Sequence, residues 1–295
     1  MNAGREPHGA CAAVDAAIAG AFTHACLLEL QALKPGNVHR FADGHGMSLA
    51  DFTASAAACA PAIATRGARV GARILAAVQA SWAAVGCNTN LGIVLLCAPL
   101  AAGADSLALP ARREAAALAA AGARQLRALD VDDAILAYRA IALARPGGLG
   151  RTPAHDVRDR PDIDLRTAMM QAQGRDRIAM QYATDFDGIF RTALPCLRRH
   201  AAGNPLAVAA SALYLELLAQ WQDSHVLRKF GDTVAQNVST EARTLLDRYP
   251  QGDATPGAHA ALMDWDRRLK SQGINPGTTA DLTVATLFVH CLTTA

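Results

Sequence analysis

The chain is poor in aromatic side chains and has almost no net charge. Aromatic residues make up 5% of its 295 residues, so a core would be built mainly from alanine, leucine, valine and isoleucine. Alanine favours closely packed helices because it loses no side-chain entropy when a helix forms. The formal net charge of +2 is too small to indicate a nucleic-acid or acidic-membrane partner.

Long hydrophobic runs are also missing. The N-terminal stretch Met1 to Gly9 is polar and has no apolar signal core. No uncharged apolar run reaches the roughly 20 residues that a membrane span needs. The longest run, Leu91 to Gly103, predicts a buried helix. These features predict a cytoplasmic protein with no membrane partner.

Paired cysteine motifs and the common nucleotide-binding motifs are absent. The odd number and irregular spacing of the cysteines predict reduced thiols that act mostly as small core residues. There is no phosphate loop, no dinucleotide-binding glycine fingerprint and no His-Glu-x-x-His, so the usual nucleotide folds are unsupported. The seven cysteines are Cys11, Cys26, Cys59, Cys87, Cys97, Cys196 and Cys291.

Apolar residues recur at helical spacing through most of the chain, and no series of alternating strand segments appears. We therefore expect an all-α fold of about a dozen helices. The polar stretch 151–164 predicts a long loop that is functional or mobile. One domain over residues 1–295 is favoured, with a candidate boundary near 145–164. The expected helices are Ala12–Leu33, Leu49–Ile63, Val70–Trp82, Leu91–Leu100, Arg112–Leu126, Val131–Ala142, Leu165–Met170, Arg177–His200, Pro205–Gln220, Thr233–Arg248, Gly257–Gln272 and Thr279–Leu292.

Two polar Pro-Gly turns lie near opposite ends of the chain. The first is Lys34-Pro35-Gly36-Asn37-Val38-His39-Arg40, and the second opens Asn275-Pro276-Gly277-Thr278-Thr279-Ala280-Asp281-Leu282. The first favours either a phosphate-binding corner or an ordinary helix C-terminus stopped by proline. Asp43 and His45 follow it closely, so a metal or acid–base site is a further alternative.

Two further polar segments carry candidate ligands. Asn88, Thr89 and Asn90 precede an apolar helix, where they could cap the helix or leave its free N–H groups to hold an anion. The segment Asp223 to Asp232 contains a carboxylate, a histidine and a basic pair. That set suits a base, a metal ligand and a phosphate contact, yet it is also ordinary for a solvated helix end.

The order and spacing of four of these motifs resemble the triphosphoribosyl-dephospho-CoA synthase family over about residues 20–292. The motifs are Lys34-Pro35-Gly36, Asn88-Thr89-x-x-Gly92, Asp223-Ser224-x-Val226-Leu227 and Asn275-Pro276-Gly277-x-x-Ala280-Asp281-Leu282. The resemblance implies an all-α transferase. In the implied reaction, ATP loses adenine and its triphosphoribosyl group passes to the 2′-hydroxyl of 3′-dephospho-CoA. The product is the precursor of the prosthetic group of citrate lyase or malonate decarboxylase acyl carrier proteins.

The implied reaction suits the residue types present. Breaking an N-glycosidic bond builds positive charge on the ribose and requires an acid for the leaving adenine, so we expect Asp281 and Asp223 to be catalytic. Mg²⁺ bound with ATP would use Asp43 and Asp223. The partners would be a nucleotide and a cofactor precursor, and a homo-oligomer is compatible with these features. The expected substrate- and phosphate-binding residues are Lys34, Gly36, Asn37, His39, Arg40, His45, Asn88, Thr89, Asn90, His225, Arg228, Lys229, Asn275, Gly277 and Thr278.

Three departures from the family pattern leave other functions open. His39 stands where the family has Asp, Gly44-His45-Gly46-Met47 shortens a Gly-Ala-His-x-Asp-Met motif, and Asn90-Leu91 replaces His-Lys. The sequence is similar to family members associated with one-carbon metabolism, so one alternative is a changed substrate in the synthesis of a tetrahydromethanopterin-type cofactor. The other is a non-catalytic nucleotide- or cofactor-binding protein.

Overall fold

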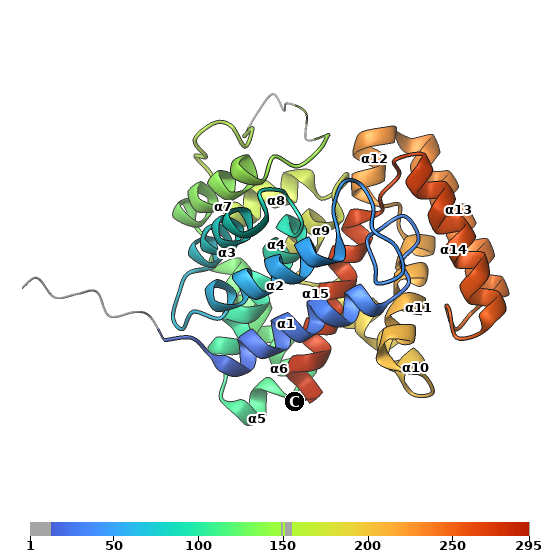
Figure 1. Cartoon of the computed structure of the whole chain (residues 1–295). Coiled ribbons are helices and arrows are strands. Elements are labelled where there is room, and N and C mark those ends of the chain that lie inside the picture. Colours follow the sequence, from blue (N-terminus) through green and yellow to red (C-terminus); the bar gives the residue numbers. More distant parts are fainter. Residues whose placement is uncertain (1–12, 149, 151–154, 295) are drawn as a thin grey trace, which may run out of the picture.

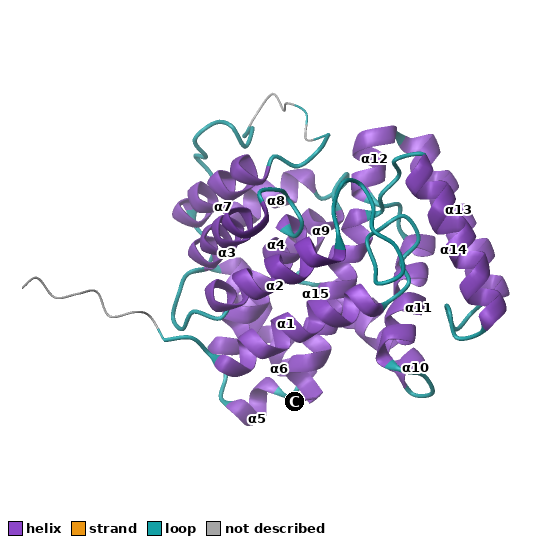
Figure 2. Ribbon diagram, viewed as in Figure 1, coloured by secondary structure: helices purple, strands orange, loops and turns teal. Residues whose placement is uncertain are grey.

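A computed structural model describes residues 13–148, 150 and 155–294 and confirms the all-α prediction (Figure 1). Helices and loops make up this part of the chain, in which paired β-structure is limited to isolated bridges (Figure 2). The elements are α1 (Ala16–Gln31), α2 (Leu49–Ile63), α3 (Val70–Val85), α4 (Leu91–Asp105), α5 (Leu109–Arg112), α6 (Ala115–Arg127), α7 (Val131–Ala144), α8 (Leu165–Ala172), α9 (Arg177–Ala183), the π-helix η1 (Gly188–Ala193), α10 (Leu194–Ala201), α11 (Leu206–Gln220), α12 (Ser224–Phe230), α13 (Asp232–Arg248), α14 (Pro256–Ser271) and α15 (Gly277–Thr294).

Many helix starts are fixed by a polar residue just before the first turn. Asp15, Asp164, Asp176 and Asp223 each accept hydrogen bonds from the first backbone N–H groups of the helix that follows. These N–H groups have no partner inside the helix, so a capping oxygen stabilises each start by about 1 kcal/mol. Short polar signals thus set where the helices begin.

The helices α4 and α15 form the centre of the molecule. Every residue from Leu91 to Ala104 is buried, so the prediction of a buried helix over this apolar run is confirmed. Helix α15 packs against α1, α4 and α11 and runs through the middle of the view in Figure 1. None of the described helices has the length and apolarity that a membrane crossing requires.

The buried apolar side chains form two clusters. The larger one spans α1–α4, α6, α7, α10 and the inner face of α15. The smaller one joins α11 to α14 and includes Leu33 and Ile274, which lie beside the two Pro-Gly turns. Both turns are therefore anchored on the same apolar cluster, although they are more than two hundred residues apart in sequence.

The predicted helix Arg177–His200 is wrong, because the structure breaks this segment into three elements. Helix α9 ends at Ala183, and Asp185 and Phe186 adopt positive φ angles of 53° and 66°. The Phe186 side chain is fully buried, and the side-chain oxygen of Gln181 accepts a hydrogen bond from Ile189 N at 3.2 Å. Core packing and this side-chain bond replace the helical hydrogen bonds that are lost at the break.

Two short helices were not predicted, and the cysteines behave largely as expected. Helix α5 begins beside Pro110, and α12 begins at the Asp223 cap.

The six described cysteines are unpaired, and five of them are buried. Cys11 lies outside the described residues.

Candidate functional site

A cavity of about 580 Å³ lies where the N-terminal ends of α4, α9 and α15 meet. Helices α7, α8 and α12 also contribute to its wall, together with Phe52 of α2 and Glu29 of α1. Further lining residues come from the loop between α7 and α8 and from the two Pro-Gly turns. Much of the surface is aliphatic, with Leu91, Ile141 and Leu165 among its apolar residues. The cavity thus combines an apolar wall with polar groups from several segments, which is the usual composition of a small-molecule site.

The two Pro-Gly turns predicted from the sequence touch each other beside this cavity. The Asn37 amide donates to Asn275 Oδ1 at 2.8 Å. Gly36 has a φ of +84°, and a Cβ added there would lie 2.8 Å from the Pro276 ring. Gly36 is therefore required both by the backbone conformation and by the close approach of the second turn. Asn37, Asn275, Gly277 and Thr278 all line the cavity, as a ligand-binding role requires.

The Asp281 carboxyl group faces the cavity without a hydrogen-bond partner among the described residues. Burial holds the pKa of Asp281 well above its usual range, and the nearby Asp223 and Glu29 carboxylates raise it further. A Cβ on Gly92 would collide with the Asp281 carboxyl group, so the glycine leaves room for it. This shift favours the protonated form of Asp281, which is the form that can donate a proton to a bound molecule.

Asp223, the other expected catalytic residue, holds two helices together. Its Oδ1 accepts from the backbone N–H groups of His225 and Val226 in α12. Its Oδ2 accepts from both the backbone N–H and the hydroxyl of Thr279 in α15. The carboxylate is fully buried with four donors and does not line the cavity among the residues described. Its contacts suit a positioning role for the α15 N-terminus.

Lys34 lies beneath the cavity wall. Its Nζ is fully buried, pairs with Glu29 and donates to Asn37 Oδ1 at 3.1 Å and to the Val38 carbonyl at 2.8 Å. Burial raises the pKa of Glu29 and lowers that of Lys34, and each partner opposes the shift of the other. Glu29 lines the cavity, so Lys34 acts as a buried counter-ion that holds Glu29 and Asn37 in place.

Two other basic residues expected at the site, Arg40 and Lys229, make contacts outside the cavity. Arg40 donates to Gln31 and lies over the Phe41 ring. Lys229 of α12 is exposed and lies over the Phe230 ring. Neither is among the described residues that line the cavity.

His39, His45 and Asp43 also have contacts outside the cavity. The buried His39 ring lies 3.3 Å from Asp266 Oδ1, and burial lowers its pKa. A ring nitrogen of His45 bonds the Gly36 carbonyl at 2.7 Å, and Asp43 accepts from Leu49 N at 2.8 Å. These contacts fix the loop after the first turn.

The remaining predicted residues do meet in the cavity. Asn88, Thr89 and Asn90 line it at the start of α4, and His225 and Arg228 line it from α12. Burial lowers the pKa of His225 to about 4, and the positive charge of Arg228 adds to this effect. His225 is therefore a neutral imidazole at physiological pH.

Sequence reasoning did not assign seven polar residues of the cavity to the site: Glu29, Tyr138, Arg145, His155, Asp156, Arg175 and Asp176. Glu29 carried a signal, because it is the one acidic residue within the apolar segment of α1. Arg145 ends α7 with a positive φ of 47°, and Arg175 precedes the Asp176 cap of α9. Both arginines belong to the α7–α9 region, whose place beside the motifs depends on tertiary packing.

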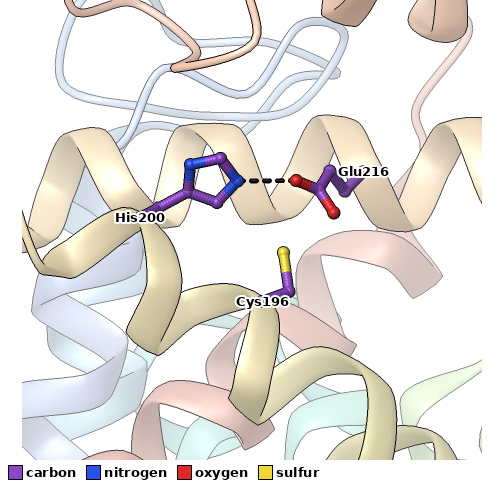
Figure 3. A group of neighbouring side chains, drawn as sticks. All are labelled: Cys196, His200 and Glu216. Atoms are coloured by element: carbon purple, nitrogen blue, oxygen red, sulfur yellow. Dashed lines mark hydrogen bonds and ion pairs between the residues drawn. The ribbon is translucent and has the colours of Figure 1, made fainter.

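A second group of ligand-type side chains lies on α10 and α11, outside the cavity (Figure 3). The ligand atoms of Cys196, His200 and Glu216 are within 4.8 Å of one another, close enough for a metal ion to bridge them after small movements. Glu216 already accepts from His200 at 2.6 Å and from Arg199 at 2.5 Å, so its charge is balanced without a metal. The arrangement acts as an ion-paired clamp between the two helices.

Comparisons with known proteins agree with the family resemblance. Residues 15–295 match the family described as ATP:dephospho-CoA triphosphoribosyl transferase. The crystal structure of a candidate triphosphoribosyl-dephospho-CoA synthase from Archaeoglobus fulgidus is 24% identical in sequence and superposes with a TM-score of 0.65. The alignment covers 82% of this chain and 98% of the archaeal chain, which shows a shared fold. No curated protein matches the sequence.

Proposed function

The chain belongs to the ATP:dephospho-CoA triphosphoribosyl transferase family, and on that basis we propose that it transfers the triphosphoribosyl group of ATP to a hydroxyl group of a cofactor precursor. Adenine is the leaving group, and 3′-dephospho-CoA is the first acceptor to test. The observation that carries the proposal is the Asp281 carboxyl group. It faces the cavity, has a raised pKa and has no hydrogen-bond partner among the residues described.

The reaction needs one group that gives and then regains a proton. In the first half, the bond between C1′ and the adenine nitrogen breaks, and protonated Asp281 gives its proton to the departing base. The resulting carboxylate lies near the positive charge that develops on the ribose and stabilises it. In the second half, the acceptor oxygen bonds to C1′, and its proton returns to Asp281. Adenine and the O-linked triphosphoribosyl glycoside are the products, and no proton is left over.

The other cavity residues would orient the substrates around this carboxyl group. Asn37 and Asn275 offer amide groups for the ribose hydroxyls, and the neutral His225 ring can accept or donate a hydrogen bond. The apolar side chains of α7 and α8 exclude water, which would otherwise compete with the acceptor hydroxyl.

We assign no step to Mg²⁺. That Mg²⁺ accompanies the bound ATP stays a prediction. Asp43 and Asp223 do not fit a metal site in the cavity, because neither lines it and both accept hydrogen bonds from backbone N–H groups. Their contacts are structural.

A changed acceptor is the second candidate function, and Leu91 favours it. Leu91 lines the cavity at the position where the family resemblance implies a lysine. Asn90, beside it, stands where that resemblance implies a histidine. These replacements make this side of the wall less basic than the family pattern implies. A precursor of a tetrahydromethanopterin-type cofactor is therefore the alternative acceptor.

Incubation of the purified protein with Mg-ATP and 3′-dephospho-CoA tests the proposal. We expect free adenine and a CoA product heavier by one triphosphoribosyl group, both followed by chromatography and mass spectrometry. Adenine released only with a pterin precursor would support the second candidate. ATP binding without adenine release for any acceptor would contradict both and would indicate a non-catalytic binding protein.

A further inference from the structure

The charges that line the cavity are unevenly compensated. Glu29 pairs with Lys34, and Asp176 accepts from Arg228 at 3.2 Å. Asp156 also lines the cavity and lies 3.5 Å from an Arg158 nitrogen. Burial and the nearby carboxylates raise the pKa of Asp281, which disfavours its charged form. Each acidic group of the wall therefore has a basic partner or a raised pKa.

The positive charges of Arg145 and Arg175 are not compensated in this way. Both line the cavity and are exposed, and neither guanidinium group has a hydrogen-bond or ion-pair partner in the part of the chain that the structure describes. Their charges are therefore uncompensated, and together they favour an anionic ligand. Arginine presents a planar fork of donors that matches the oxygen atoms of phosphate groups.

Arg228 connects these two residues in space. Its Nε donates to the Gly147 carbonyl, two residues after Arg145, at 3.2 Å. Its Nη1 donates to Asp176, the residue next to Arg175. Arg228 therefore contacts a residue close in sequence to each free arginine, and all three arginines line the cavity.

The first turn of α15 supplies further donors to the cavity wall. His225, one turn before Arg228 on α12, approaches Gly277 so closely that a Cβ there would lie 3.0 Å from its Nδ1. Thr278 is 4% exposed and lines the cavity, and its hydroxyl has no partner among the described residues. The Thr278 backbone N–H is also free of partners there, since Gly277 N and Thr279 N are the ones with acceptors. An uncapped N–H at the start of a long helix attracts a negative charge.

We propose that Arg145, Arg175, Arg228 and Thr278 form an oligophosphate-binding subsite. The inference rests on the proposed function and assigns the phosphate chain of the nucleotide to these residues. The ribose then lies toward Asp281, one helical turn after Thr278 on the same helix. The positive charges come from the end of α7, the residue before the α9 cap, and α12.

Calorimetric binding of inorganic triphosphate tests the subsite without any turnover. We expect binding by the wild type, and a loss of roughly tenfold or more in affinity for both Arg145→Gln and Arg175→Gln, since each removes a charge-assisted contact. Thr278→Val keeps the shape of the side chain and should also weaken binding. Arg139→Gln is the matched control, because Arg139 is exposed on α7 and does not line the cavity.

The outcomes separate this inference from the transferase proposal. Failure of the wild type to bind triphosphate, or unchanged affinity in the Arg145→Gln, Arg175→Gln double variant, overturns the subsite even if adenine is released. Arginine-dependent triphosphate binding without adenine release supports the subsite and leaves the transferase proposal contradicted. Thermal unfolding of each variant checks that the fold is intact, which is expected because both arginines are exposed.

Discussion

Neighbouring donors decide what each acidic side chain of this protein can do. Asp223 accepts four hydrogen bonds, which join α12 to α15. Asp281 lies on α15, faces a cavity and has a raised pKa. Glu216 shows the opposite shift, since hydrogen bonds from His200 and then Arg199 lower its pKa to about 2. The same functional group is thus an anchor in Asp223, an ion-pair partner in Glu216 and, in the proposed mechanism, a proton donor in Asp281.

The lowered pKa of Glu216 predicts acid-dependent stability. Its folded-state pKa of about 2 lies below the usual unfolded value near 4.3. The pair therefore stabilises the fold above about pH 5, and this contribution is lost as the pH falls toward 2. We expect Glu216→Gln to lower the free energy of unfolding at pH 7 by about 1–2 kcal/mol, discounted for partial exposure.

Urea unfolding at several pH values measures this difference. The gap between wild type and Glu216→Gln should shrink between about pH 5 and pH 2. Asp247→Asn, at an exposed position of α13, should follow the wild type throughout. A gap that stays constant with pH would show that the charge of Glu216 is not what stabilises α10 against α11.

Where a motif combined an unusual turn with a ligand-type side chain, the residues singled out from the sequence lie on the cavity wall. Asn37, Asn275, Thr278 and Asp281 were found this way and line one cavity. Lys34 was expected to bind phosphate, but its ion pair with Glu29 could not be predicted from the sequence pattern. Arg145 and Arg175 were missed because each follows an ordinary helix end.

At the scale of elements, the contact between α4 and α6 depends on a glycine. A Cβ at Gly103 would lie 2.8 Å from Gly122 N and 3.0 Å from the Ala121 carbonyl carbon. These are backbone atoms, which cannot move away by a rotamer change as a flexible side chain can. We expect Gly103→Ala to push the helices apart and to lower the free energy of unfolding by about 1–3 kcal/mol.

Gly122→Ala is the matched control on the facing helix. Its Cβ would meet side-chain atoms of Leu100 and Phe186 at 3.4 Å or more, which is ordinary contact. Since alanine favours helix by up to about 1 kcal/mol, this variant should be neutral or more stable in urea unfolding. Equal effects of the two substitutions would contradict the close approach at Gly103.

Helix positions were largely predictable, because apolar periodicity and polar caps are local properties. The expected ranges for α2, α11 and α15 agree with the structure to within two residues. The break after α9 was not predictable in this way. It depends on Phe186 entering the core and on Gln181 bonding Ile189, which are contacts that only the folded chain creates.

For the whole molecule, the fold brings the two ends of the chain to one site. The turn at Gly36 packs on the turn at Pro276. The sequence could not show that α7, α8 and α9 close the other side of the cavity. That arrangement arises from packing of α9 on α4 and α8, and it supplies the unmatched arginines.

The most direct test of the account is single-turnover adenine release from saturating Mg-ATP, with the acceptor present, in wild type and Asp281→Asn. The amide fills the same space beside Gly92 but cannot transfer a proton to the base. We predict a rate lower by about 10²- to 10⁴-fold, with ATP affinity within about threefold and Asp247→Asn unchanged. A folded Asp281→Asn protein that releases adenine at the wild-type rate would contradict the central role of this carboxyl group.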